Sequence, residues 1–317
     1  MKLVNEFEKR HAAAAVSRKF GLPADEVVYV RDGYELVRYL MRCAEQCRSR
    51  VAAIYPAAEQ PALSRAVADS LNGVRPVLLS RFVRPIRCSY LQMPGPYGGL
   101  LAELEYVCTG AEHARRMASM EAALAAAAAD IRAAAGPRAP DWARAYAVVE
   151  YAVRHWRYCD DGVWSYTPYG ALVDHEAVCM GISLAAQMLM KQMGVPCLYL
   201  QGKRRPEDAM GHAWNLIYCG GWFHLDVTDA VAARDPLAFW GVTALTDRSL
   251  EPGLTLPGPL RNGHQLVVDR VTQRSVQDFV EHGLDRCIFE RGRDGFVDID
   301  LFAFEKERVA GLLFDLL

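Results

Sequence analysis

Three residues of the sequence form the kind of set that nucleophilic catalysis uses. Cys179 begins the apolar stretch "CMGISLAAQMLMKQMG", which predicts a helix. A thiol is a useful nucleophile only as the thiolate, and the first turn of a helix favours that charge. His212 and Asp226 follow along the chain. Because a histidine can serve as the base and a carboxylate can fix its tautomer, Cys179, His212 and Asp226 are candidates for such a set.

Two strands and a helix must bring these residues together. "HAWNLIYC" predicts a strand that begins at His212, and "WFHLDVT" predicts a second strand that contains Asp226. The Gly-Gly pair between them predicts a hairpin, in which Asp226 lies near level with His212 or just beyond it. "PCLYLQG" predicts a strand before them. The helix of Cys179 then needs only to pack across this hairpin.

Taken together, these stretches resemble the core of the transglutaminase-like superfamily. "AVCMG", "GHAWN" and "WFHLDVT" are similar in order and spacing to its motifs, and "YGALV" resembles the lead-in of bacterial members. The resemblance runs from about Tyr169 to Asp229. It implies an α+β, papain-like fold, in which the helix bearing the cysteine packs on an antiparallel sheet. One departure is Asp229, which stands where many bacterial members have an aromatic residue, and it puts the shape of the substrate cleft in doubt.

The resemblance also implies an activity. Cys179 would be the nucleophile, His212 the general base and acid, and Asp226 the orienting group of a cysteine-dependent hydrolase or acyltransferase. Such an enzyme acts on peptide or protein amide bonds through a thioester acyl-enzyme. The alternative is a non-catalytic protein-binding module that retains the fold. Whether water or an amine would accept the acyl group stays open.

Four further residues are candidates for the oxyanion hole or the substrate cleft. The Cys179 backbone N–H and one side-chain donor would meet the oxyanion. Tyr169 and Trp164 are the candidate donors, and Tyr169 is closer to the motif. Gly181 has no side chain to obstruct a substrate. Trp214 belongs to the core of the hairpin or, alternatively, to the wall of the cleft.

Each catalytic candidate also has a structural explanation when taken alone. Cys179 could be a buried cysteine, His212 a hydrogen-bonded core histidine, and Asp226 the cap of a turn. With His175, the same three residues could imitate a zinc set. Since thiolate–imidazole chemistry needs no metal, we expect neither a metal nor a cofactor.

Composition narrows the class of partner. Lys and Arg number 36 against 38 Asp and Glu, a net charge of −2, and the charges are interspersed, so we expect no binding to nucleic acid or to membranes. No stretch reaches the ~20 apolar residues of a membrane span. Nine cysteines without a CxxC pair indicate a reducing compartment, and we expect a cytoplasmic protein. The expected partner is a peptide or protein substrate, and the oligomeric state stays open.

The chain is expected to have three parts. Residues 1–110 form an N-terminal α/β region of unknown role, 111–235 the catalytic core with its leading helices, and 236–317 a small C-terminal α/β extension that could pack with the N-terminal region. Within 236–317 we expect an irregular stretch to about residue 265, then helix, strand and helix. The pattern predicts further helices over 1–20, 34–47, 61–73, 112–136 and 141–155, and strands over 26–30, 50–56 and 101–109.

Overall fold

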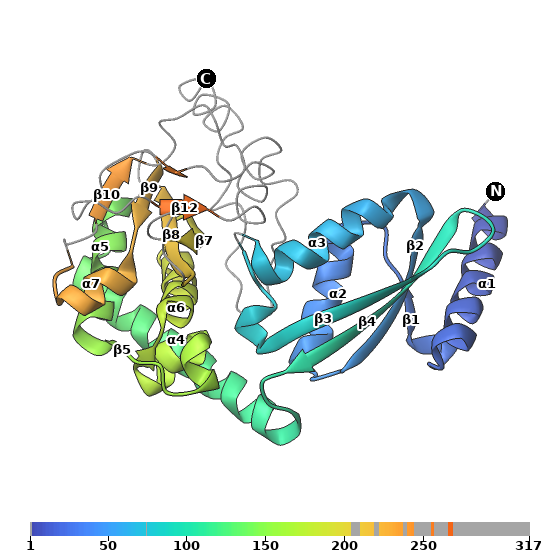
Figure 1. Ribbon diagram of the computed structural model, residues 1–317, viewed down its shortest axis with the longest axis horizontal. Helices are drawn as coiled ribbons and strands as arrows, with labels where there is room; N and C mark the ends of the chain where they lie inside the picture. Colours follow the sequence, from blue (N-terminus) through green and yellow to red (C-terminus); the bar gives the residue numbers. More distant parts are fainter. Residues whose placement is uncertain are drawn as a thin grey trace. The chain divides into compact units, whose positions relative to one another are not determined.

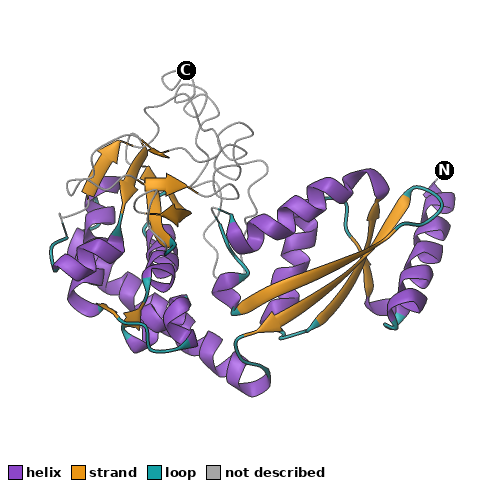
Figure 2. Cartoon of the chain, viewed as in Figure 1, coloured by secondary structure: helices purple, strands orange, loops and turns teal. Residues whose placement is uncertain are grey.

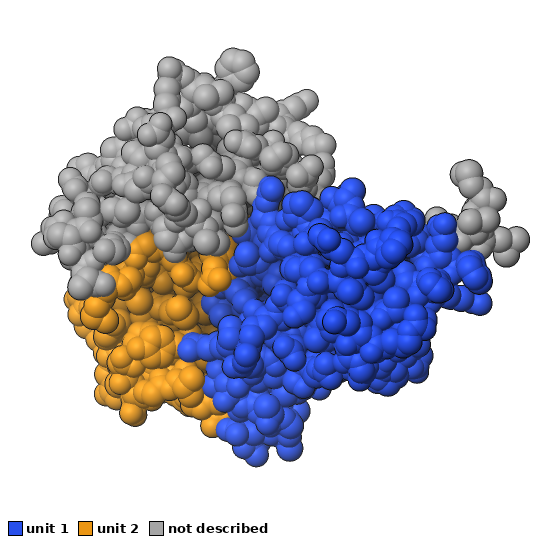
Figure 3. Space-filling model, turned by 45° about the vertical axis from the view of Figure 1, so that its right-hand side comes forward, with its two compact units in different colours: residues 1–71, 76–115 blue, residues 72–75, 116–317 orange. Residues whose placement is uncertain are grey.

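The computed structural model describes residues 2–73, 75–203, 210–218, 222–236, 240–243, 255–256 and 266–268. The chain divides into two compact units, which Figure 3 colours separately and which are described here one at a time. The first comprises Met1–Leu71 and Pro76–Arg115, the second Asn72–Arg75 and Arg116–Leu317. The helices and strand expected beyond residue 268 lie outside the described residues.

The first unit is a four-stranded sheet with helices, as expected of an α/β region (Figures 1 and 2). The sheet has the order β1-β2-β4-β3, with β1 parallel to β2 and the other neighbours antiparallel. Its strands are β1 (Val27–Tyr29), β2 (Arg50–Pro56), β3 (Val83–Leu91) and β4 (Tyr97–Tyr106). Its helices are α1 (Lys2–Phe20), α2 (Gly33–Glu45) and α3 (Gln60–Asn72).

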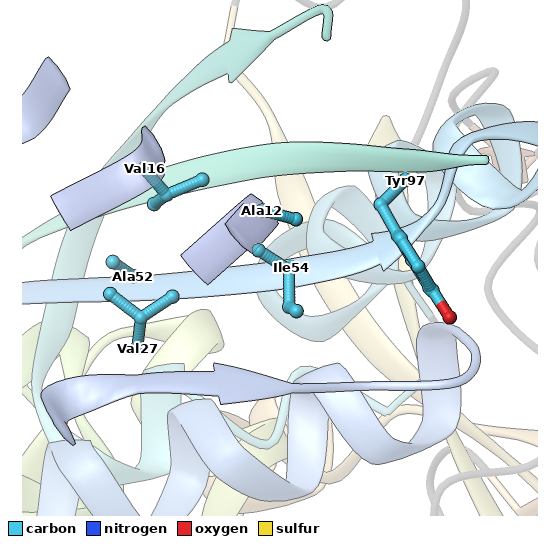
Figure 4. Close-up of a cluster of buried hydrophobic side chains, with 6 residues drawn as sticks. All are labelled: Ala12, Val16, Val27, Ala52, Ile54 and Tyr97. Atoms are coloured by element: carbon cyan, nitrogen blue, oxygen red, sulfur yellow. The ribbon is translucent and has the colours of Figure 1, made fainter. Parts of the chain in front are cut away.

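Helices cover both faces of this sheet, which explains the unbroken apolar run of β2. On one face, Ala12 and Val16 of α1 pack in a buried cluster with Ile54 of β2, as Figure 4 shows. On the other face, the ring of Tyr55 lies edge-on to that of Tyr90. The Tyr90 hydroxyl accepts a hydrogen bond of 2.7 Å from Ser64 of α3. A strand buried on both faces shows no alternation of apolar and polar residues.

Two parts of this unit differ from the expectation. Strand β4 opens at Tyr97–Gly99, ahead of the strand expected over 101–109. A β-carbon on Gly98 would lie 2.6 Å from the Tyr55 ring, and one on Gly99 2.4 Å from Val16, so the glycines permit close packing on both faces. Strand β3 was not expected at all, because it contains a proline within the irregular register between Val83 and Ile86.

The second unit is built on a six-stranded sheet of order β10-β9-β8-β7-β12-β11, antiparallel throughout. Its strands are β7 (Cys197–Lys203), β8 (His212–Tyr218), β9 (Trp222–Leu225), β10 (Trp240–Thr243), β11 (Thr255–Leu256) and β12 (Leu266–Val268). A separate parallel pair joins β5 (Arg157–Tyr158) to β6 (Glu176–Ala177). The stretch 236–265, expected to be irregular, thus contains β10 and β11, which are held by pairing that local sequence does not reveal.

In the described part of the chain, four α-helices belong to this unit or lead into it (Figure 1). They are α4 (Gly110–Ala135), which begins in the first unit, α5 (Asp141–His155), α6 (Cys179–Gln192) and α7 (Val227–Ala233). Helix α6 packs on β7 and β8, where Gln187 donates to the Cys197 carbonyl at 3.0 Å. The expected arrangement, a helix bearing the cysteine on an antiparallel sheet, is confirmed. Among the described residues, no helix is both long and apolar enough to cross a membrane.

Candidate active site

Cys179 is the first residue of α6, and the chain before it is extended. Val178 has φ −85° and ψ 177°, so the helix begins abruptly at the cysteine. Ile182, Leu184 and Leu189 of this helix are all buried, as expected of a helix at the centre of a core. The N–H groups of a first helical turn have no acceptor within the helix. The sulfur of Cys179 therefore lies at the N-terminal end of α6, where the helix dipole favours the negatively charged thiolate.

A loop lies directly against Gly181. A β-carbon at this position would be 2.4 Å from the carbonyl oxygen of Ser165 and 2.7 Å from that of Thr167. The Val178 N–H also donates to the Ser165 carbonyl, at 3.0 Å. The missing side chain of Gly181 therefore makes room for this loop, whereas we expected it to leave room for a substrate.

His212 opens strand β8 and is nearly buried, with 7% of its surface exposed. Its ring lies almost parallel to the indole of Trp214, with 15° between the planes and 5.8 Å between the centroids. The spacing of two residues along a strand places both side chains on one side. Trp214 is completely buried, so the structure places it behind the imidazole and away from solvent.

Asp226 lies at the junction of β9 and α7. Its Oδ2 atom is 2.6 Å from Nε2 of His212, and its Oδ1 atom accepts a hydrogen bond of 3.1 Å from the Asp229 N–H. The second contact makes Asp226 the N-cap of α7. Leu225 pairs with Asn215, so Asp226 reaches His212 diagonally across the hairpin.

The thiol of Cys179 contacts the imidazole of His212, the ring that Asp226 also contacts. Burial disfavours its thiolate, but the hydrogen bond with His212, the charge of His212 and a hydrogen bond from the Ala213 N–H outweigh burial. These contacts lower the pKa of Cys179 below the ordinary thiol value. Because Nε2 of His212 faces Asp226, Nδ1 is the nitrogen that is left to form the hydrogen bond with the Cys179 thiol. An imidazole that donates from Nε2 to a carboxylate can accept a proton on Nδ1.

Asn215 joins the two elements that carry the cysteine and the histidine. It is completely buried on β8, and its Nδ2 atom donates to the Ser183 carbonyl of α6 at 3.0 Å and to the Leu198 carbonyl of β7 at 3.4 Å. The asparagine of the "HAWN" stretch, three residues beyond His212, thus ties α6 to the sheet. This link joins the helix that begins at Cys179 to the strand that begins at His212.

The two candidate oxyanion donors lie together on the loop before Cys179. The ring centroids of Trp164 and Tyr169 are 5.2 Å apart. The guanidinium of Arg116 lies 4.0 Å from the centroid of Trp164 and 4.9 Å from that of Tyr169. Tyr169 is buried and Trp164 half-buried. Sequence reasoning did not single out Arg116, which forms a cation–π cluster with both rings.

Sequence reasoning also misses Tyr166 and Asp160. The Tyr166 hydroxyl donates to Oδ2 of Asp160 at 2.8 Å. This hydrogen bond is the main reason that the pKa of Tyr166 is raised, and the charge of Cys179 adds to the effect. Tyr166 stands between Ser165 and Thr167, whose carbonyls lie against Gly181 in the first turn of α6. The only signal in the sequence is the general richness in aromatic and acidic residues of "WRYCDDGVWSYTPY".

Asp229, the departure from the family pattern, is buried in the first turn of α7. Its N–H is the group that holds Oδ1 of Asp226. The altered position therefore contacts the orienting carboxylate. An acidic residue in a first helical turn is also favoured by the helix dipole.

His175, the fourth residue of the possible zinc set, has a left-handed backbone with φ 61°. Its ring centroid is 6.4 Å from that of His155. Within the described ranges, no three His, Cys, Asp or Glu side chains are placed to hold a metal ion together.

Comparisons with known proteins bear on the same segment. Residues 125–227 match the core model of the transglutaminase-like superfamily. A search of curated proteins finds no match. One similar solved structure is a TGase, at 12% identity and TM-score 0.32, with 56% of this chain and 50% of that one covered. This chain therefore spans half the length of that TGase.

Two other solved structures are similar at the same low level. One is a proposed cysteine protease from Cytophaga hutchinsonii, at 14% identity and TM-score 0.29, covering 58% of this chain and 82% of that one. The other is a proposed protease from Parabacteroides distasonis, at 8% identity and TM-score 0.26, covering 56% and 39%. The family match includes Cys179, His212 and Asp226, the residues that the fold brings together. Residues 125–227 of this chain are a transglutaminase-like core.

Proposed function

We propose that this protein is a cysteine-dependent hydrolase or acyltransferase that acts on amide bonds of peptides or proteins. One observation carries the proposal: a single imidazole, that of His212, is hydrogen-bonded to the Cys179 thiol and lies 2.6 Å from the Asp226 carboxylate. A cysteine that only filled the core would gain nothing from an oriented base. The arrangement suits a nucleophile that needs a proton acceptor.

In the first step, the Cys179 sulfur attacks the carbonyl carbon of the amide, and a C–S bond forms. The negative charge that develops on the carbonyl oxygen is met by the Cys179 N–H and by a second donor, for which Tyr169 and Trp164 are the candidates. When the C–N bond breaks, His212 gives the leaving amine the proton that it took from the thiol. A thioester on Cys179 remains.

In the second step, water or a primary amine attacks the thioester. His212 removes a proton from the attacking group, the C–S bond breaks, and the proton returns to the thiolate. Throughout both steps, Asp226 keeps the proton on Nε2 and stabilises the imidazolium that forms. This route needs only groups of this chain, and it accounts equally for hydrolysis and for amine transfer.

In the test, the full chain is incubated with casein and a fluorescent primary amine, dansylcadaverine. New peptide N-termini measure peptide-bond hydrolysis, and fluorescence attached to casein measures amine transfer. We expect at least one signal from the native protein and neither from Cys179→Ala. Absence of both signals, with casein retained equally by the native protein and by Cys179→Ala, would favour the binding module instead.

A further inference from the structure

We propose that Asp160 and Tyr166 form a cation-recognition site beside the nucleophile, and that it selects substrates with a positively charged group next to the reacting amide. The inference rests on the proposed function, since it assigns a substrate class to the same thiol. Neither residue belongs to the Cys-His-Asp set. Their role would be to choose the substrate.

The backbone on both sides of Tyr166 is fixed over the start of α6. The Ser165 carbonyl accepts the Val178 N–H at 3.0 Å, and the carbonyls of Ser165 and Thr167 both lie against the α-carbon of Gly181. Tyr166 stands between these two carbonyls in the sequence. It is therefore held at the first turn of α6, the turn that begins with Cys179.

The short parallel ladder of β5 and β6 brings the chain before Asp160 alongside the chain before Cys179. Tyr158 pairs with Ala177, and the Cys159 N–H continues the ladder to the Ala177 carbonyl at 3.2 Å. Asp160 follows directly, and its carboxylate accepts the Tyr166 hydroxyl at 2.8 Å. The carboxylate is therefore held at the residue that the Ser165 and Thr167 carbonyls anchor to α6.

The direction of the hydrogen bond decides what this pair can bind. The Tyr166 hydroxyl donates its hydrogen bond to Asp160. The hydroxyl oxygen and the carboxylate therefore offer only acceptors to a ligand. Beside them the Tyr158 ring is 47% exposed. Acceptors, a negative charge and an exposed aromatic face together suit an ammonium or guanidinium group.

The adjacent positive charge does not cancel the preference of this pair for cations. Arg157, the adjacent cation on β5, forms an ion pair with Glu176. Asp160 itself is exposed and Tyr166 half-buried, so a ligand can reach both. An exposed hydrogen bond also contributes little to folding, which argues against a purely structural role.

The test uses charged thiol reagents, because it requires no knowledge of the natural substrate. Methyl, 2-aminoethyl and 2-sulfonatoethyl methanethiosulfonate are neutral, cationic and anionic. Each transfers its thioalkyl group to the thiolate, forms a disulfide and releases methanesulfinate. Rates at Cys179 are followed in the full chain by peptide mass mapping. They are divided by the rates of the same reagents with mercaptoethanol.

In the native protein we expect the cationic reagent to react faster than the anionic one after this correction. Asp160→Asn should lower the cation-to-anion ratio roughly fivefold, the effect of one nearby charge in water, and added salt should reduce the preference. Tyr166→Phe should lower the ratio as well, since it releases Asp160. The matched control is Asp161→Asn, which removes the same charge one residue away and should change the ratio much less.

Two results would overturn the inference: a native ratio equal to that of mercaptoethanol, or equal effects of Asp160→Asn and Asp161→Asn. The neutral reagent separates this failure from that of the proposed function. If the neutral reagent labels Cys179 rapidly and His212→Ala abolishes this, the activated thiol stands whatever the ratio. If neutral labelling is slow and independent of His212, the proposed function and the inference both fall.

Discussion

His212 and Asp226 meet through a contact of 2.6 Å between Nε2 and Oδ2, at the point where strand β9 gives way to helix α7. The other oxygen of Asp226 caps that helix by accepting the Asp229 N–H. A carboxylate with both oxygens engaged cannot turn away from the imidazole. The orientation of the His212 imidazole is therefore set by a helix cap as well as by the hairpin.

Two substitutions of Asp226 should separate its roles. In Asp226→Asn, an oxygen still caps α7, but the amide cannot hold the proton on Nε2 of His212. We expect turnover of casein to fall by about 10⁴-fold with little loss of thermal stability. Asp226→Ala should lose the cap too and cost about a further 1 kcal/mol of unfolding free energy. Asp226→Asn with native turnover would remove Asp226 from the mechanism.

The pH dependence of alkylation should report the state of Cys179. Its pKa is lowered, so the rate of iodoacetamide alkylation should rise at a pH below the ordinary thiol pKa of about 8.5. His212→Ala removes the two contributions of His212 that lower the pKa, and burial, which raises it, is then opposed by the Ala213 N–H alone. The midpoint of the rate profile should therefore move to higher pH in this variant. Identical midpoints in the two proteins would show that His212 does not activate the thiol.

Gly181→Ala should disturb the loop that carries Tyr166. The new methyl group would overlap the carbonyl oxygens of Ser165 and Thr167. We expect a loss of about 1–3 kcal/mol in unfolding free energy, measured by urea titration. Met180→Ala is the control. Met180 precedes Gly181 in the helix and is only half-buried, so this change should lower the unfolding free energy by less. Equal losses in both variants would mean that the loop yields easily.

Asn215→Asp should weaken the link between α6 and the sheet. A buried carboxylate would face the carbonyls of Ser183 and Leu198 with no proton to donate. We expect a loss of about 1–3 kcal/mol at neutral pH. Stability should partly recover in mild acid, where a protonated carboxyl can donate once. Gln92→Glu, an exposed change of the same kind, should show neither effect; a pH-independent loss in Asn215→Asp would contradict the account.

Elements with strong local patterns could be predicted from the sequence. The helix expected over 141–155 has those bounds in the structure, and the hairpin of β8 and β9 forms where alternating residues flank a Gly-Gly pair. The same periodicity brings His212 and Asp226 to one region. These features depend on residues close together along the chain, which is why pattern alone identifies them.

Features that depend on distant backbone could not be predicted. Gly181 appears open in the sequence, yet a loop that precedes it by more than a dozen residues fills the space. Tyr166 and Asp160 carry no motif, and the pairing of β5 with β6, which brings the two ends of their loop together, is not visible in the local sequence. The sequence indicates that Asp226 could cap a turn, but not that a helix, α7, begins there, because the family motif suggests only a strand end.

The β5–β6 pair has a consequence for how this protein could change over time. It ties Arg157–Tyr158 to Glu176–Ala177, so the loop between them leaves and rejoins the core at one fixed base. Sequence changes within that loop would leave its two paired ends, and so the start of α6 at Cys179, in place. Under the proposed function, exchanging this one segment would change which substrates reach the thiol, and the segment suits grafting as a unit.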